Sequence, residues 1–372
     1  MPSRTSARRR STLRTAALSL AAATALLVTG VTGQAATAEP PSSGEPGPTL
    51  NESLRSAAHQ YGVPRDLLAA VGYGETHFDG HRGKPSQAGG YGVMHLVSNP
   101  TLHTLEQASK LTGEPVAELR KDTDANVHGG AAVLRAYADK LKLDAADRHD
   151  ADAWYPVVAR YSGAQGGTAR LYADTVYELL ESGVHGTGPG GERITVTGRD
   201  VHPDKDKADA DGPGVLSPDY PDATWVPADP ANYRAGRAEK LDKIIIHVTQ
   251  GSYAGSISWF QNPEAQVSAH YVVRSSDGEI TQMVRDADTA YHARSANASA
   301  LGIEHEGYVD DPSWFTDAMY RSSAKLTRHL ADKHGIPLDR QHIIGHSEAP
   351  GNDHTDPGKH WDWDTYMKLV KG

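Results

Sequence analysis

The stretch Lys243-Ile244-Ile245-Ile246-His247-Val248 decides the fold of the C-terminal half of the chain. A run of β-branched residues of this kind is typical of a strand that is buried inside a sheet. His247 stands near the end of the run, where a rigid strand would aim its side chain in a fixed direction. The stretch therefore predicts a β-sheet with a candidate functional residue at the end of one strand.

The residues after this strand predict further strands mixed with a helix. Two apolar runs at 267–273 and 280–284 flank Ser275-Ser276-Asp277-Gly278, which is the pattern of a hairpin. A helical pattern follows and ends near Gly335, with inward positions at Met319, Leu326 and Leu330. We therefore expect residues 222–372 to form an α/β domain with a central mixed β-sheet flanked by helices.

The N-terminal half has a different pattern. Residues 50–185 carry apolar positions at helical spacing and no alternating strand pattern, so we expect a helical domain there. Residues 39–49 are rich in Pro, Gly and Ser and are interpreted as a flexible leader, and residues 186–221 are interpreted as a linker for the same reason. The chain is thus expected to be multidomain, with two halves that fold separately and move with little coupling.

Residues 1–38 have the pattern of a secretory signal peptide. Five arginines open the segment, an apolar stretch of small residues follows, and Ala36-Thr37-Ala38 supplies a cleavage site. A membrane anchor is the alternative, but the apolar stretch is interrupted by polar residues and is short for a span of about 20 residues. We expect a secreted, extracellular protein without a stable membrane anchor.

Composition limits the partners and the metal chemistry. The five arginines are the only charges of residues 1–38, so removing that segment takes the formal net charge from −10 to −15. An acidic protein of this kind is a poor candidate for binding nucleic acid. Cysteine is absent, so a metal site must use the carboxylates and the 19 histidines. We expect a monomer.

Three segments carry residues suited to a hydrolytic zinc site, which needs three protein ligands and one water. They contain His247 after the isoleucine run, His346 in Gly345-His346-Ser347-Glu348, and Asp356 in His354-Thr355-Asp356-Pro357-Gly358. Spacing alone leaves open that these are ordinary polar residues of loops.

Residues 218–368 resemble the type-2 family of zinc-dependent N-acetylmuramoyl-L-alanine amidases, which share their fold with the peptidoglycan recognition proteins. Six motifs match in family order: Ile-Ile-Ile-His, Val-Ser-Ala-His-Tyr-Val-Val, Ala-Tyr-His-Ala, Leu-Gly-Ile-Glu-His-Glu-Gly, Ile-Ile-Gly-His and His-Thr-Asp-Pro-Gly. The resemblance implies a Zn²⁺ cofactor held by His247, His346 and Asp356. It also implies cleavage of the amide between N-acetylmuramic acid and L-alanine in bacterial peptidoglycan, and hence a protein associated with the cell wall.

The resemblance also suggests roles for other residues. Amide hydrolysis needs a carboxylate that takes the proton of the attacking water and passes it to the amine. The motif places this base at Glu304, although Glu306 shares its strand face and periodicity alone does not separate them. His354 stands where the family often carries lysine. As a cation it would stabilise the oxyanion, and activity should then fall at high pH. His292 is a candidate substrate contact or a packed histidine.

Residues 50–183 resemble the lysozyme-like lytic transglycosylase domains through fewer motifs. These include Glu75-Thr76-His77-Phe78, the segment from Ser86 to Leu96, and Ala159-Arg160-Tyr161-Ser162-Gly163. The resemblance implies a catalytic acid at Glu75, where one carboxylate suffices because a sugar substituent assists. Two positions depart from the family, since His95 replaces a usual Gln and Ser162 a usual Asn. The domain is therefore expected to bind the glycan strand, and the sequence leaves open whether it also cleaves that strand.

Two function classes remain open from the sequence. One is an amidase with a second, glycan-directed domain, and the other is a non-catalytic protein that binds peptidoglycan. The complete set of His247, His346, Asp356 and Glu304 favours the enzyme, since a pure binding protein has no need of all four. A zinc peptidase is disfavoured because the chain lacks a His-Glu-x-x-His motif.

Overall fold

Strand β7 (Lys243–Val248) lies inside a six-stranded mixed sheet in the computed structural model of the chain, which describes residues 47–207 and 218–372. The strand order is β12-β7-β11-β8-β9-β5. Strands β12, β7, β11 and β8 are parallel, β9 is antiparallel to β8, and β5 is parallel to β9. The expected α/β architecture with a central mixed sheet is confirmed for this half.

The other elements of this half surround the sheet. The strands are β5 (Thr224–Trp225), β6 (Tyr233–Arg234), β8 (Tyr271–Val273), β9 (Ile280–Gln282), β10 (Thr289–Ala290), β11 (Ala300–His305) and β12 (Ile343–Gly345), and β6 pairs with β10 outside the sheet. The helices are α8 (Tyr253–Phe260), α9 (Asp317–His334) and α10 (Trp363–Lys371). The predicted β8–β9 hairpin and the end of α9 at Gly335 are both confirmed.

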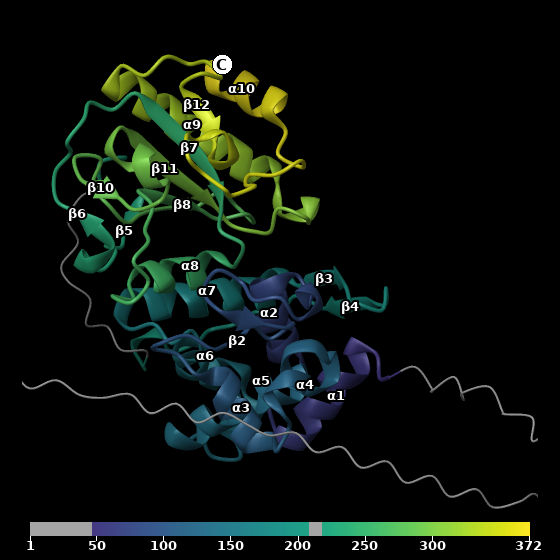
Figure 1. Cartoon of the computed structure of the whole chain (residues 1–372). Coiled ribbons are helices and arrows are strands. Elements are labelled where there is room, and N and C mark those ends of the chain that lie inside the picture. The colour runs from purple at the N-terminus through teal and green to yellow at the C-terminus, as the bar shows by residue number, and fades with distance from the viewer. Residues whose placement is uncertain (1–46, 208–217) are drawn as a thin grey trace, which may run out of the picture. The chain divides into compact units, whose positions relative to one another are not determined.

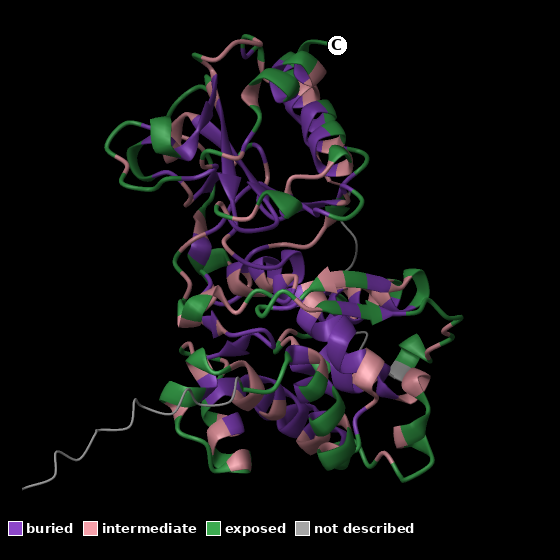
Figure 2. Cartoon of the chain, turned by 90° about the vertical axis from the view of Figure 1, so that its right-hand side faces the viewer, coloured by how far each residue is buried: buried purple, intermediate pink, exposed green. Residues whose placement is uncertain are grey.

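The two faces of β7 have different neighbours. Ile244 and Ile246 pack into the core that contains the apolar sides of α9 and α10. Both helices lie along one side of the sheet (Figure 1). The strand alternation turns Ile245 and His247 to the opposite face. The central strands are buried along most of their length (Figure 2). Burial on both faces explains why β7 is an almost unbroken apolar run, and it leaves His247 as a polar group in an apolar setting.

The N-terminal half of the described chain is largely helical. Its helices are α1 (Leu50–Tyr61), α2 (Arg65–Thr76), α3 (Thr104–Thr112), α4 (Val116–Lys121), α5 (Thr123–Lys140), α6 (Tyr155–Tyr161) and α7 (Gly166–Ser182), with a short pair β1 (Gly90–Tyr91) and β2 (Leu96–Val97). Thr49 and Glu52 form a capping box at the start of α1, and Gly62 ends it in the left-handed conformation. Their apolar stripes form one core.

The predicted linker at 186–221 begins with ordered structure. Strands β3 (Val184–Thr187) and β4 (Arg193–Val196) pair as an antiparallel hairpin. Val184, Ile194 and Val196 are buried in the helical core. The Gly- and Pro-rich sequence between them forms the hairpin turn, where Gly191 has φ of 81°. The linker prediction was wrong for this stretch because turn composition resembles linker composition.

Residues 47–372 form one compact unit, so the two halves contact each other in the structure. The expectation that they fold separately and move with little coupling stays a prediction. The hydroxyl of Thr168 on α7 donates a hydrogen bond to the side-chain oxygen of Gln261 at 2.7 Å, and the side-chain amide of Asn262 donates to the hydroxyl of Thr101 at 2.7 Å. The ring of His77 stacks on Trp314 with centroids 3.5 Å apart and planes 2° from parallel. No sequence pattern within either half predicts these contacts between the halves.

The His77 contact predicts a pH-dependent stability. Burial lowers the pKa of His77 to about 4, although Asp311 partly opposes the shift. As the pH falls, His77 is therefore protonated near pH 6.5 in the unfolded chain but only near pH 4 in the folded chain. The free energy of unfolding therefore decreases as the pH falls through this window. We expect His77→Phe, which keeps a ring against Trp314, to lose less thermal stability than the wild type between pH 7 and pH 4.5. Equal losses in melting experiments would contradict this.

The N-terminal segment is outside the described residues. The predicted signal peptide at 1–38 and most of the predicted leader at 39–49 fall there, so both stay predictions. Within the described ranges, no helix combines the length and apolar character needed to cross a membrane.

Candidate metal centre

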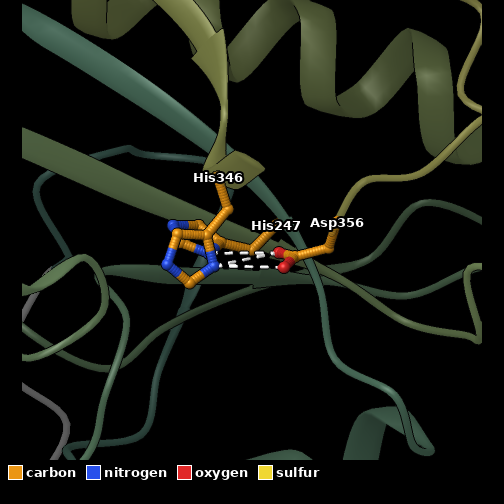
Figure 3. Close-up of side chains that lie close together, drawn as sticks. All are labelled: His247, His346 and Asp356. Carbon is orange, nitrogen blue, oxygen red and sulfur yellow. Dashed lines mark hydrogen bonds and ion pairs between the residues drawn. The ribbon is translucent and has the colours of Figure 1, made fainter. Parts of the chain in front are cut away.

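The structure brings His247, His346 and Asp356 together from three separate segments. Each offers one ligand atom, and these atoms lie within 4.8 Å of one another (Figure 3). Nδ1 of His346 is 3.1 Å from Asp356 Oδ1, and Nδ1 of His247 is 3.4 Å from Asp356 Oδ2. All three side chains are buried. Two imidazoles and one carboxylate form a donor set that suits a divalent ion such as zinc.

The backbone fixes the positions of all three residues. His247 is on β7, and His346 directly follows the neighbouring strand β12. A Cβ at Gly345 would lie 2.7 Å from Pro357, so only glycine lets the segment after Asp356 approach this closely. The amide of Val248 donates to Asp356 Oδ2 at 3.3 Å and ties the loop to the end of β7.

The electrostatics of the group favour a neutral His247 and a charged Asp356. Burial lowers the pKa of His247 to about 4, against the opposing effect of its hydrogen bond to Asp356. Burial alone would raise the pKa of Asp356, but hydrogen bonds from His247 and His346 outweigh it and hold this pKa well below its usual range. Neutral imidazole and ionised carboxylate are the protonation states that bind metal ions.

Glu304 lies beside this group. The parallel register of β11 and β7 pairs Glu304 directly with His247. Its carboxyl is buried, and burial with the nearby charge of Asp356 raises its pKa well above the usual value. Oε2 of Glu304 has no hydrogen-bond partner within the described residues. A buried polar atom without a partner is costly, so this oxygen is poised to accept a proton or a ligand.

Glu306 differs from Glu304 in its hydrogen bonding. Its Oε1 accepts a bond from the amide of Tyr253 at 2.8 Å, and its Oε2 accepts one from the amide of Ser275 at 2.7 Å. Both oxygens therefore bind backbone groups that connect β11 to its neighbours. The structure thus distinguishes the two carboxylates, which strand periodicity could not. Both oxygens of Glu306 accept backbone hydrogen bonds, whereas Oε2 of Glu304 has no partner among the described residues.

His292 lies directly behind the metal group. Its Nδ1 is 3.0 Å from Nε2 of His247, while its own Nε2 has no partner within the described residues. A Cβ on Gly302 would come within 2.7 Å of the His292 ring, so glycine at that point of β11 makes room for it. Burial first, and then the neighbouring histidines, lower the pKa of His292 well below the usual value. His292 thus contacts the candidate metal ligand His247. The contact is made at Nε2 of His247, the imidazole nitrogen that does not face Asp356.

His354 lies at the exposed edge of the same group. Its ring stacks on that of His346 with centroids 4.4 Å apart, and its Nδ1 is 3.8 Å from Asp356 Oδ1. About half of its side chain is exposed, in contrast to the buried residues around it. The structure therefore places His354 where a molecule entering from solvent would meet it.

One cavity of about 540 Å³ joins these groups, with Glu304, His292, His346, His354 and Asp356 in its wall. His247 does not line the cavity but belongs to the same group as His346 and Asp356. The structure thus brings together six of the seven candidate site residues proposed from the sequence. The orphaned atoms of Glu304 and His292 in this wall fit a site that holds an ion and water.

Glu75, the seventh residue, lies elsewhere. It is buried on α2 and takes part in a different set of hydrogen bonds. Tyr172 donates to its Oε1 at 2.7 Å, Ser252 donates to its Oε2 at 2.9 Å, and Nδ1 of His95 is 3.1 Å from Oε2. The cavity beside it has a volume of only about 50 Å³. Sequence reasoning missed Tyr172 and Ser252 because they are 97 and 177 residues away along the chain.

Comparison with known proteins identifies the family to which the C-terminal half is similar. Residues 237–359 match the N-acetylmuramoyl-L-alanine amidase family. N-acetylmuramoyl-L-alanine amidase A of Achromobacter lyticus is 41% identical over 171 residues, which are 41% of this chain and 96% of that protein. The chain belongs to the N-acetylmuramoyl-L-alanine amidase family. The resemblance found in the sequence, and with it the prediction of an amidase, is confirmed.

Two further similarities complete the comparison. A solved structure of a selenomethionine derivative of AmpD is 27% identical, covers 42% of this chain and 98% of its own, and has a TM-score of 0.35. The membrane-bound lytic murein transglycosylase F 1 of Alkalilimnicola ehrlichii is 32% identical over 112 residues, or 30% of this chain. The chain spans about a fifth of that protein's length (20%), so the likeness is a hint of a transglycosylase-like part and no more.

Proposed function

We propose that the protein is a zinc hydrolase that cleaves the amide between N-acetylmuramic acid and L-alanine in bacterial peptidoglycan. One observation carries the proposal. One cavity is lined by His346 and Asp356, which form a group with His247, and by a buried carboxylate, Glu304, whose Oε2 has no hydrogen-bond partner among the described residues. A protein that only bound peptidoglycan would gain nothing from keeping such a costly oxygen unpaired.

Each residue of the cavity has a chemical task in this proposal. Zinc held by His247, His346 and Asp356 would act as a Lewis acid and lower the pKa of bound water to about 7. Glu304 would take the water proton on Oε2, the oxygen without a hydrogen-bond partner, and pass it to the leaving amine. His292 holds the ring of His247 in place through the hydrogen bond to Nε2. His354 faces the oxygen on which negative charge develops.

The test is mass spectrometry of fragments released from purified peptidoglycan. The amidase should release stem peptides that begin with L-alanine and leave the glycan strands without peptide. A chelator should stop the release, and added zinc should restore it. Binding to peptidoglycan without any released fragment would instead establish the non-catalytic recognition protein.

His354 supports a prediction of its own. If it stabilises the developing oxyanion by donating a hydrogen bond, His354→Ala should lower kcat by about 10²–10³-fold, in the range found when one such donor is removed. His354→Lys should retain most of the activity, because the lysine ammonium group presents a hydrogen-bond donor at the same position. Both variants should keep the fold, since the side chain is half exposed. Steady-state kinetics on a soluble muropeptide would decide, and a Lys variant as poor as the Ala variant would contradict the role.

For the helical half we propose binding of the glycan strand. Glu75 has a partner on each carboxylate oxygen, and the adjoining space of about 50 Å³ is too small for a sugar ring. A carboxylate engaged in this way is poorly placed to protonate a glycosidic oxygen, which favours binding over cleavage. Mass spectrometry of the same digests checks this, because glycan cleavage would shorten the strands.

The proposal includes export to the cell wall by the signal-like residues 1–38. A mature protein of net charge −15 would not adhere to an anionic wall by bulk attraction, so shaped sites must provide the binding. Detection of a processed chain outside the cytoplasm, with its new N-terminus near Glu39, is the expected result, and gel filtration should find a monomer.

A further inference from the structure

We propose that residues 85–87 of the helical half form a sugar-binding subsite of the amidase cavity, with Gln87 contacting the glycan residue next to the muramic acid whose amide is cut. The inference rests on the proposed function and deepens it. It assigns to the helical half a role in selecting the amidase substrate, separate from any chemistry at Glu75.

The first observation is the position of the segment. Pro85, Ser86 and Gln87 line the same cavity of about 540 Å³ as Glu304 and His346, although they belong to the other half of the chain. Gln87 is exposed, and its side-chain amide makes no hydrogen bond to the described residues that would compete with a ligand. The cavity therefore has one wall that the C-terminal half does not supply.

The second observation is that this wall is held in place. Oγ of Ser86 is 2.7 Å from Nε2 of His95, whose Nδ1 contacts Glu75 at 3.1 Å. Ser86 also accepts a hydrogen bond from the amide of Gly90 at 3.0 Å. All these side chains are buried. The chain Glu75–His95–Ser86 thus ends at the cavity, and it provides the rigid support that a binding residue needs.

A third observation ties the segment to the C-terminal half. The amide of Gln87 donates to the carbonyl of Gln250 at 3.2 Å. Gln250 follows β7 by two residues, so this bond connects the segment to the strand that carries His247. The position of the Gln87 backbone relative to the end of β7 is therefore fixed by a backbone hydrogen bond.

The chemistry of the surrounding wall selects the ligand. The cavity wall includes the neutral hydrogen-bonding side chains of Gln87, Gln250 and Gln266, together with the charged side chain of Arg294. Such groups match the hydroxyl and acetamido groups of an amino sugar. The scissile amide joins a sugar to a peptide, so the cavity must receive sugar on one side of the metal group. The side that continues toward the glycan-directed half is the one formed by residues 85–87.

Kinetics of the full chain on two soluble substrates test the subsite. One is a muramyl peptide, and the other is the same peptide on the disaccharide of N-acetylglucosamine and N-acetylmuramic acid. Gln87→Ala should raise KM for the disaccharide substrate about 3–10-fold, as expected for one lost neutral hydrogen bond, with kcat and zinc content unchanged. KM for the muramyl peptide should not change.

Gln60→Ala is the matched control, because Gln60 is an exposed glutamine on α1 of the same half and does not line the cavity. It should leave both KM values unchanged. An unchanged KM for the disaccharide substrate in Gln87→Ala, or an equal rise for both substrates, would overturn the sugar subsite. Failure of the wild type to cut either substrate would instead overturn the proposed amidase, so the two failures are distinguishable.

Discussion

Glu304→Gln is expected to lower kcat by about 10²–10⁴-fold while the protein keeps its fold and its zinc. Glutamine has nearly the same shape as glutamate, and Glu304 donates no ligand atom to the group formed by His247, His346 and Asp356. The amide cannot take a proton from water, so the loss should fall on kcat. Steady-state kinetics with elemental analysis of the same samples would measure both quantities.

Glu306→Gln is the matched control on the same strand face. Its two oxygens accept backbone amides of Tyr253 and Ser275, and an NH₂ group would leave one of these donors without an acceptor. We expect a loss of about 1–3 kcal/mol in the free energy of unfolding and little change in kcat of the folded protein. A large fall in kcat for Glu306→Gln, with none for Glu304→Gln, would reverse the assignment of the base.

The parts of the fold and site that sequence could predict depend on local pattern. The isoleucine run before His247 specified a buried strand. Gly335 stopped α9 where the helical periodicity ended. Each of these features is set by residues within a few positions of one another, so one sequence contains the needed signal.

The parts that sequence could not predict depend on contacts between distant segments. Glu75 meets Ser252 across 177 positions, and residues 85–87 reach a cavity whose other walls begin at Val248. Hydrophobic periodicity shows which face of an element is buried and does not show what covers it. The hairpin at β3 and β4 was missed for a related reason, because Gly and Pro mark tight turns and linkers alike.

Asp356→Ala is expected to abolish zinc binding and to lower activity to background. The carboxylate is one of the three candidate ligands, and it also orients the other two, since His247 and His346 both direct Nδ1 toward it. Two histidines alone leave too few ligands for a stable zinc site, which in hydrolases has three from the protein. Elemental analysis should find about one zinc per wild-type chain and none in the variant.

Thermal unfolding separates metal loss from damage to the fold. Zinc binds the folded chain, so it should raise the melting temperature of the wild type, and a metal present at 100 times its Kd adds about 2.7 kcal/mol. Chelator should remove this increment from the wild type and change nothing in Asp356→Ala. His354→Ala is the control, because His354 adjoins Asp356 at 3.8 Å and is not part of the ligand group. It should keep both the zinc and the increment. A wild-type chain that holds no zinc, and that regains no activity when zinc is added, would overturn the zinc site at His247, His346 and Asp356.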